Sequence, residues 1–249
     1  MSDTQANTDT RGLGRKLADI DKTAVAPFLA LAALFVLGAL VNPSFIGIDN
    51  ILNVLTRSSF IAIIAVGATF VISAGGLDLS VGSMAALVAG IMILFLNSAA
   101  IDGNFAMLAA GVVIAIGVGA GAGLVNGAVT TLGRIEPFIV TLGTMAIYRS
   151  VTVWLANGGS IAMKSSEMRN LFRPVYTGTF LGLPIPVWII IAVGLLGAFI
   201  LYKTSFGRHV IAVGSNEDVA RYSGIHVNRV RAMTYVIQGI CVAIAVVSS

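Results

Sequence analysis

The chain contains seven long apolar runs, and these runs constrain its fold more than any other feature. They lie at residues 23–41, 59–74, 81–97, 105–126, 138–155, 185–201 and 232–247. A straight helix needs ~20 mainly apolar residues to cross ~30 Å of hydrocarbon, so the shorter runs must be extended by flanking polar residues or be partly re-entrant. Charged residues make up 10% of the chain, whereas a soluble domain has about 25%. The sequence therefore predicts an all-α fold, a polytopic transmembrane helical bundle in a lipid bilayer.

Lysine and arginine side chains indicate which ends of the runs face the cytoplasm. If the N-terminus is inside, ten basic residues fall in inner segments and four in outer segments. Cytoplasmic loops carry the excess of Lys and Arg in membrane proteins, so we expect the polar tail, residues 1–22, to be cytoplasmic. Residues 23–249 form the transmembrane domain, and their polar loop 202–231 returns to the cytoplasm. The last apolar run stops abruptly at Ser249, which is the pattern expected of a truncated chain.

The residue sets that mark enzymes and metal proteins are missing from the sequence. Cys241 is the one cysteine, so it has no internal disulfide partner, and His209 and His226 lie far from it. No Walker-A pattern for binding nucleotide phosphates is present. No basic patch carries the interleaved aromatic residues of a nucleic-acid surface. The sequence therefore predicts no enzyme, with no cofactor, no metal and no nucleic-acid partner.

Asp78 stands behind two glycines in the stretch VISAGGLDLSVGSMAALVAG, residues 71–90. Gly75 and Gly76 interrupt the helical pattern, so the next helix should begin near Asp78 or Ser80. A carboxylate at that place can accept hydrogen bonds from free N–H groups and face the positive end of the helix dipole. The break can also lie at membrane depth and line a pathway, as broken helices do in transporters. Both interpretations stay open at the level of sequence.

Glycines recur at steps of four in the run at 105–126 and just beyond it. Gly119, Gly123 and Gly127 predict a smooth helix face that another helix can approach closely. Asn126, beside the last of them, can form a hydrogen bond across helices or act as a cap. Arg149 lies within the run at 138–155 and either faces protein or a water-filled cavity, or reaches the outer interface.

A short helix is predicted inside the polar loop 202–231. Ser215 or Asn216 is its N-cap, two acidic residues occupy its first turn, and Gly224 ends it. A capped helix on the cytoplasmic face can dock into the groove of a partner protein. The alternative is an interfacial helix that lies against lipid headgroups.

Four segments identify a resemblance to a known family, and they occur in the family's order. They are SAGGLDLSVGSMAAL, PFIVTLGTMAIYRS, NGGSI and TSFGRHVIAVGSNEDVARYSGI. They are similar to the permease subunits of bacterial ABC importers for monosaccharides such as ribose, xylose, arabinose, galactose and inositol. The resemblance implies a homodimer in the bacterial inner membrane, with about ten helices per subunit. It also implies a cytoplasmic sugar-type ABC ATPase and a periplasmic sugar-binding protein as partners.

The chain departs from the family at three places. Glu136 stands where the family has proline, and Val219 stands where alanine is common. The family also continues well beyond Ser249, so the transmembrane domain is expected to be incomplete, with about seven of the helices present. Dimer closure and transport competence depend on the part that continues.

The resemblance also implies two groups of functional residues. The ATPase-coupling residues would be Asn216, Glu217, Ala220, Arg221 and Gly224. The residues along the translocation path would be Gly75, Gly76, Asp78, Ser80 and Gly82. Trp154, Tyr148 and Asn157, near the outer end of one span, offer aromatic and amide groups to sugar hydroxyls, although Trp and Tyr at that depth also anchor helices at the interface.

The predicted function is that of a membrane-spanning permease subunit of an ATP-driven monosaccharide importer that works by alternating access. The alternative is an ion-coupled secondary transporter in which Asp78 titrates. An intramembrane enzyme is disfavoured because the sequence has no catalytic set.

Overall fold

The computed structural model describes residues 22–98 and 105–248, and the chain divides into two compact units that meet in sequence after Ile51. The first unit contains α2 (Lys22–Val41) and the 3-10 helix η1 (Pro43–Ile46). Asn42 caps η1, since its side chain accepts a hydrogen bond from the backbone N–H of Ser44 at 3.0 Å. The rings of Phe35 and Phe45 meet edge to face at 5.5 Å between centroids, and this contact holds η1 against α2.

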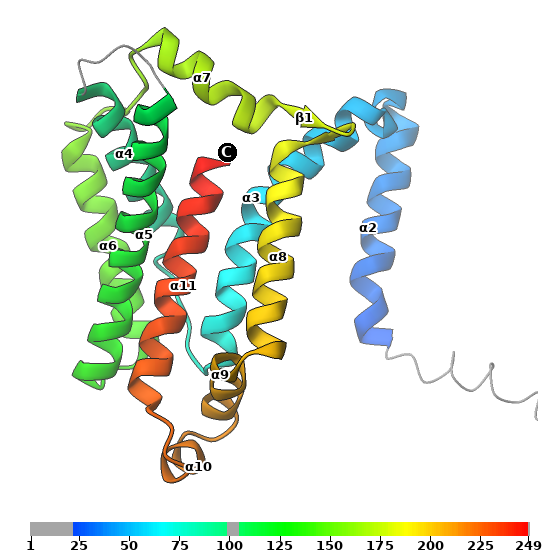
Figure 1. Ribbon diagram of the computed structural model, residues 1–249. Coiled ribbons are helices and arrows are strands. Elements are labelled where there is room, and N and C mark those ends of the chain that lie inside the picture. The colour runs from blue at the N-terminus through cyan, green and yellow to red at the C-terminus, as the bar shows by residue number, and fades with distance from the viewer. Residues whose placement is uncertain (1–21, 99–104, 249) are drawn as a thin grey trace, which may run out of the picture. The chain divides into compact units, whose positions relative to one another are not determined.

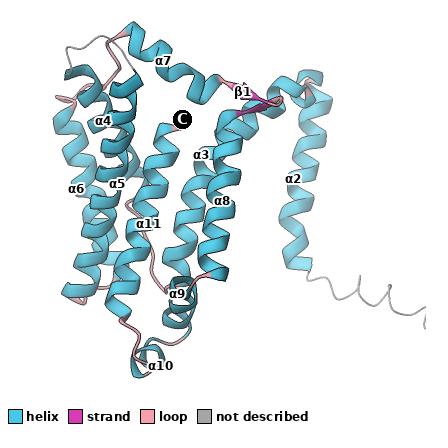
Figure 2. Ribbon diagram, viewed as in Figure 1, coloured by secondary structure: helices cyan, strands magenta, loops and turns pink. Residues whose placement is uncertain are grey.

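The second unit is built from long apolar helices. They are α3 (Ile48–Ser73, which begins in the first unit), α4 (Val81–Ser98), α5 (Phe105–Gly133), α6 (Pro137–Leu155), α8 (Ile185–Lys203) and α11 (Val227–Val247). In the described part of the chain, these six helices are long and apolar enough to cross a membrane. The apolar stretch of α2, Val25–Val41, is shorter than any of them. The predicted all-α bundle is confirmed (Figure 2).

The helices occupy the predicted runs but extend past several of their ends. The helix at the second run begins at Ile48 rather than at residue 59, α5 continues to Gly133 rather than 126, and α11 begins at Val227 rather than 232. These extensions include polar residues such as Asn53, Arg57 and Asn228, in line with the ~20 residues that a span needs. The break between α3 and α4, at residues 74–80, is non-helical.

The segment 156–184, between the fifth and sixth apolar runs, contains structure that hydropathy did not reveal. Helix α7 (Ser166–Thr177) begins at Ser165, whose side chain accepts a hydrogen bond from the N–H of Met168. Strands β1 (Thr179–Phe180) and β2 (Leu183–Pro184) then pair in an antiparallel hairpin. The two residues between the strands have φ values of 51° and 78°, the positive values that a tight type I′ turn needs.

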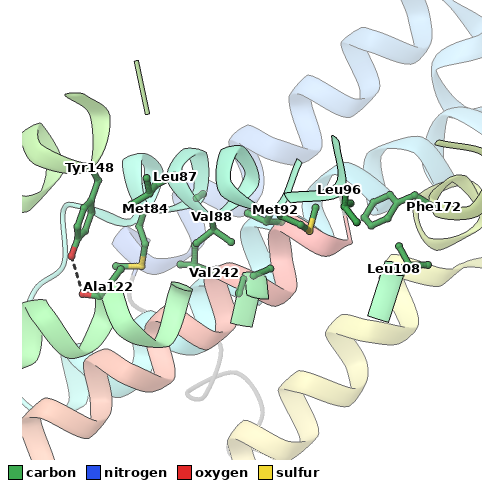
Figure 3. Close-up of a cluster of buried hydrophobic side chains, with 14 of the residues drawn as sticks. Met84, Leu87, Val88, Met92, Leu96, Leu108, Ala122, Tyr148, Phe172 and Val242 are labelled. Atoms are coloured by element: carbon green, nitrogen blue, oxygen red, sulfur yellow. Dashed lines mark hydrogen bonds between the residues drawn. The ribbon is translucent and has the colours of Figure 1, made fainter. Parts of the chain in front are cut away.

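Helix α11 is the centre of the second unit. In its most apolar stretch 56% of the residues are buried, whereas the other five long helices reach between 17% and 33%. Figure 1 shows α11 between the group α4, α5 and α6 on one side and α3 and α8 on the other. A core of buried apolar side chains from α4, α5, α7 and α11 fills the space along it (Figure 3).

The predicted glycine face on α5 packs directly against α11. A Cβ built on Gly119 would lie 2.3 Å from the carbonyl oxygen of Gly239, and one on Gly123 would lie 2.1 Å from that of Tyr235. No side chain fits at such distances, so the two backbones are in contact, and the prediction of a close-packing surface is confirmed. At Gly121, on another face of α5, nothing lies within 4 Å of the added atom.

Two shorter helices join α8 to α11. These are α9 (Ser205–Ser215) and α10 (Glu217–Tyr222), and they lie at the end of the bundle opposite α7 (Figure 1). Helix α9 starts at Thr204, whose side chain accepts a hydrogen bond from the N–H of Gly207. An apolar cluster that includes Phe70, Leu201, Val213 and Val230 holds both helices against α3, α8 and α11.

Candidate functional site: the α3–α4 break and the α9–α10 segment

The break after α3 begins with a glycine-dependent helix end. The N–H of Gly75 donates to the carbonyl of Ile72, and the N–H of Gly76 donates to that of Val71, both at 2.9 Å. These two bonds form a Schellman motif, which needs a residue at positive φ, and Gly75 has a φ of 76°. The two glycines therefore stop α3 and turn the chain into the extended segment that leads to α4.

The carboxylate of Asp78 organises the entry to α4. One oxygen accepts from the backbone N–H of Ser80 at 2.9 Å and from its hydroxyl at 2.6 Å. The carbonyl of Ser80 in turn accepts from the N–H of Met84 at 2.8 Å, so Ser80 is the N-cap residue. The prediction that α4 begins near Ser80 is confirmed. The sequence predicted that the Asp78 carboxylate accepts from N–H groups in the first turn of α4. The backbone donor is instead the N–H of Ser80, the N-cap residue that precedes this turn.

Two other helices contact this segment directly through polar side chains, and a third helix supports one of those side chains. The amide nitrogen of Asn126 donates to the hydroxyl of Ser80 at 2.8 Å, so Asn126 bonds across helices rather than capping one. The hydroxyl of Tyr148 donates to the carbonyl of Ala122 at 2.9 Å (Figure 3) and lies 3.4 Å from the side-chain oxygen of Asn126. From α11, the hydroxyl of Tyr235 donates to the carbonyl of Leu77 at 3.2 Å. The break is therefore held directly by α5 and α11, and Tyr148 on α6 bonds to α5 beside Asn126.

Two cavities meet the break at its two ends. A polar cavity of about 890 Å³ is lined by Gly75, the turn 130–137, Glu217, Arg221 and residues 225–231. A more apolar cavity of about 580 Å³ is lined by Gly82 and other residues of α4, by parts of α7 and by Phe60. Neither lining includes Asp78 or Ser80. Asp78 and Ser80 thus lie within the stretch 75–82, whose first residue lines one cavity and whose last residue lines the other.

The helix predicted in the loop 202–231 is present as α10. Asn216, rather than Ser215, is its N-cap, and its side-chain oxygen accepts from the N–H of Val219 at 3.0 Å. At its other end Gly224 has a φ of 82°, and the N–H groups of Gly224 and Ile225 donate back to Arg221 and Ala220. The predicted stop at Gly224 is confirmed, again as a Schellman motif.

The side chains of α10 divide into a buried side and an exposed side. Ala220 is buried in the apolar cluster that joins α9 to α3. Val219 and Tyr222 are exposed, Tyr222 at 91%. Among the described residues, both salt bridges end on the Glu217 carboxylate, one from Arg221 and one from Arg231. The exposed side of α10 therefore consists of Asp218, Val219, Arg221 and Tyr222, with Glu217 half-buried beside them.

Three residues of α11 contribute contacts that the sequence analysis did not assign. Arg231 binds Glu217, Tyr235 binds the break, and the fully buried Gln238 lies 3.5 Å from the carbonyl of Ile64. The available signal was the occurrence of Tyr and Gln within an apolar run, because polar side chains in a span usually face protein. The identity of their partners depends on the packing of distant helices.

The three residues proposed near the outer end of α6 do not form one group. Tyr148 is buried and bonds into the polar cluster, whereas Trp154 is 74% exposed. Asn157 lies in the exposed turn after α6, with a φ of 49°. Arg149 is also exposed in this chain. Within residues 22–98 and 105–248, no group of three or more His, Cys, Asp or Glu side chains is placed to hold a metal ion.

The fold is a bundle of long apolar helices in which a non-helical break with polar side chains lies near two cavities, an arrangement typical of membrane transport proteins. Residues 50–248 match the family described as "Branched-chain amino acid transport system / permease component". The chain belongs to this family of transport permease components, as the predicted resemblance implied.

Several relatives of this chain are named as permease proteins for the import or transport of a sugar. The chain is 38% identical to the ribose import permease protein RbsC of Haemophilus influenzae, over 88% of this chain and 66% of that protein. It is 36% identical to RbsC of Escherichia coli K12, over 87% and 66%. It is 32% identical to the D-allose transport system permease protein AlsC of E. coli K12, over 89% and 65%. The chain thus spans just under two thirds of the length of these relatives. No solved structure matches it, and nothing in the comparisons supports an ion-coupled transporter.

Proposed function

We propose that the chain is the membrane-spanning permease subunit of an ATP-driven importer that carries a monosaccharide across the bacterial inner membrane. The names of the relatives support a sugar as the substrate. The observation that carries the proposal is the stretch 75–82, which begins at one cavity and ends at the other. A segment in that position can separate the two openings in one state and join them in another.

The break has the chemistry that a neutral sugar needs. Sugar hydroxyls bind best to groups that both donate and accept hydrogen bonds. Ser80, Asn126 and Asp78 supply a hydroxyl, an amide and a carboxylate in one connected cluster. When the segment shifts, these side chains can break the hydrogen bonds that join them and form hydrogen bonds to the sugar instead. The backbone of this stretch carries no side chain at three positions, which are Gly75, Gly76 and Gly82, so side chains do not obstruct access to it there.

Import by this route needs partner proteins. We assign ATP hydrolysis to a separate cytoplasmic ABC ATPase of the sugar type, and sugar delivery to a periplasmic binding protein. A second copy of the permease completes the pathway. The N-terminus and α10 lie on the cytoplasmic side, and Tyr222 and Val219 dock into a groove of the ATPase. Asn216, Glu217, Ala220, Arg221 and Gly224 shape and hold this docking helix.

Reconstitution in proteoliposomes tests the proposal. With the ATPase, the binding protein and labelled ribose, uptake is expected only when ATP is hydrolysed, and collapse of the proton gradient should leave it unchanged. The Asp78→Asn variant should lower uptake without creating or removing a response to the gradient. A proton-dependent uptake that Asp78→Asn abolishes would instead favour the ion-coupled alternative.

The orientation has its own test. In a Cys241→Ala background, a Tyr222→Cys variant is expected to react with an impermeant maleimide in inside-out vesicles but not in intact cells. Reaction from the periplasm would contradict the docking assignment.

A further inference from the structure

Arg231, in the first turns of α11, joins two elements that are far apart in sequence. One of its terminal nitrogens lies 2.8 Å from the Glu217 carboxylate on α10. Its Nε donates to the carbonyl of Ala74, at the end of α3, at 3.4 Å. A single half-buried guanidinium therefore contacts both the α10 helix and the residue before Gly75, where the break begins.

The Ala74 carbonyl is a favourable partner for a cation. The last carbonyls of a helix have no intrahelical donor, and they carry the negative end of the helix dipole. The Schellman bonds at Gly75 and Gly76 use the carbonyls of Ile72 and Val71, so that of Ala74 is left for Arg231. Arginine suits the position because its planar fork donates in two directions at once.

Helix α9 touches the same helix end from another side. A Cβ built on Gly214 would lie 1.9 Å from the carbonyl oxygen of Ser73, so the backbones of α9 and α3 are in direct contact there. The end of α3 is thus enclosed by α9 and by Arg231. A displacement of the α9–α10 segment must push or pull this end, because no flexible side chain separates them.

We propose that Arg231 is a positioning residue that ties α10 to the α3–α4 break, so that a movement imposed on α10 reaches the segment 75–82. This inference rests on the proposed function, since it takes the ATPase to be the source of the movement. A displacement of α10 moves Arg231 through its contact with Glu217. Arg231 then moves the end of α3 through its contact with the carbonyl of Ala74.

Sugar uptake and ATP hydrolysis, measured in the same proteoliposomes, test whether Arg231 links α10 to the α3–α4 break. Arg231→Gln removes the charge, and Arg231→Lys keeps the charge but has a single nitrogen. Both variants are expected to assemble with the ATPase and to hydrolyse ATP, while the sugar imported per ATP falls roughly tenfold in Arg231→Gln, within the usual range of coupling between sites. Arg231→Lys should fall between this variant and the unmodified permease.

Arg208→Gln is the matched control. Arg208 lies on α9 and donates to Ser205 of the same helix, so its loss should leave the ratio of sugar to ATP unchanged. Full coupling in Arg231→Gln or Arg231→Lys would overturn the inference alone. An unmodified permease without ATP-dependent uptake would overturn the proposed function, and the inference with it.

A distance measurement covers the case in which the Arg231 variants fail to fold. Spin labels at Ile72, in the last turn of α3, and at Asp218, on α10, are both at exposed positions. In the unmodified complex the distance between them is expected to stay the same with and without ATP. A distance that changes with ATP would overturn the tie, since the two elements would then move independently.

Discussion

The side-chain amide of Asn126, on α5, lies 2.8 Å from the hydroxyl of Ser80, the residue that caps α4. Both side chains are fully buried. The same nitrogen lies 3.4 Å from each oxygen of Asp78. One buried amide therefore fixes the place where the broken segment enters the second of its two helices.

Replacement of this amide should destabilise the permease. Asn126→Leu removes the amide that donates to the buried Ser80 hydroxyl, and a buried polar group left without its partner costs about 1–3 kcal/mol. The thermal unfolding midpoint of the purified permease in detergent is expected to fall. Asn97→Leu is the control, because Asn97 bonds at an exposed site at the end of α4. Equal decreases in the two variants would contradict the assignment.

The α5–α11 contact gives a prediction with an internal control. Gly123→Ala places a Cβ 2.1 Å from the backbone oxygen of Tyr235, so the two helices must separate. Overpacking of this kind costs about 1–3 kcal/mol or more. Gly121→Ala, two residues away, meets nothing within 4 Å and should leave the unfolding midpoint unchanged or slightly raised. A Gly123→Ala variant as stable as Gly121→Ala would show that the helices do not pack in this way.

The location of the helices could be predicted from sequence because hydropathy reports directly on contact with lipid. The ends of the helices could not, since α3 continues through polar residues such as Asn53 and Arg57. Backbone hydrogen bonds do not depend on side-chain polarity, so a helix extends past its apolar part. Helix α7 was missed for a related reason. Its apolar residues Met168 and Phe172 are spaced for one buried face within a polar stretch.

The candidate site was predictable in part. Gly75, Gly76 and Gly224 were identified as breaks because their conformational freedom is a local property of the chain. Asn126 was identified only as a residue that bonds across helices or caps. Its partner Ser80 and the link from Arg231 to Ala74 join residues that are 46 and 157 positions apart. Such pairs follow from how the helices pack, and a single sequence carries no signal for them.

Reversal of the charge at Glu217 should separate transport from ATP hydrolysis. In Glu217→Lys a cation faces Arg221 and Arg231 in place of their shared carboxylate, so α10 is repelled from α11. Membrane insertion is expected to stay intact, because the residue lies outside the apolar helices. Uptake should fall roughly tenfold while ATP is still hydrolysed. Normal uptake at normal expression would count against the coupling role of α10.

Removal of the most exposed aromatic side chain of α10 should weaken the binding of the ATPase. Tyr222 is 91% exposed, and a tyrosine that fills a pocket in a partner often contributes about 2 kcal/mol or more to binding. Tyr222→Ala is therefore expected to raise the dissociation constant for the ATPase by roughly 30-fold. The unfolding midpoint of the permease alone should not change, since the side chain contacts little of its own chain. Tyr202→Ala, at a 69% exposed position on α8, is the control and should bind normally. Titration of the ATPase onto each variant in nanodiscs gives both constants, and equal affinities would exclude Tyr222 as a docking residue.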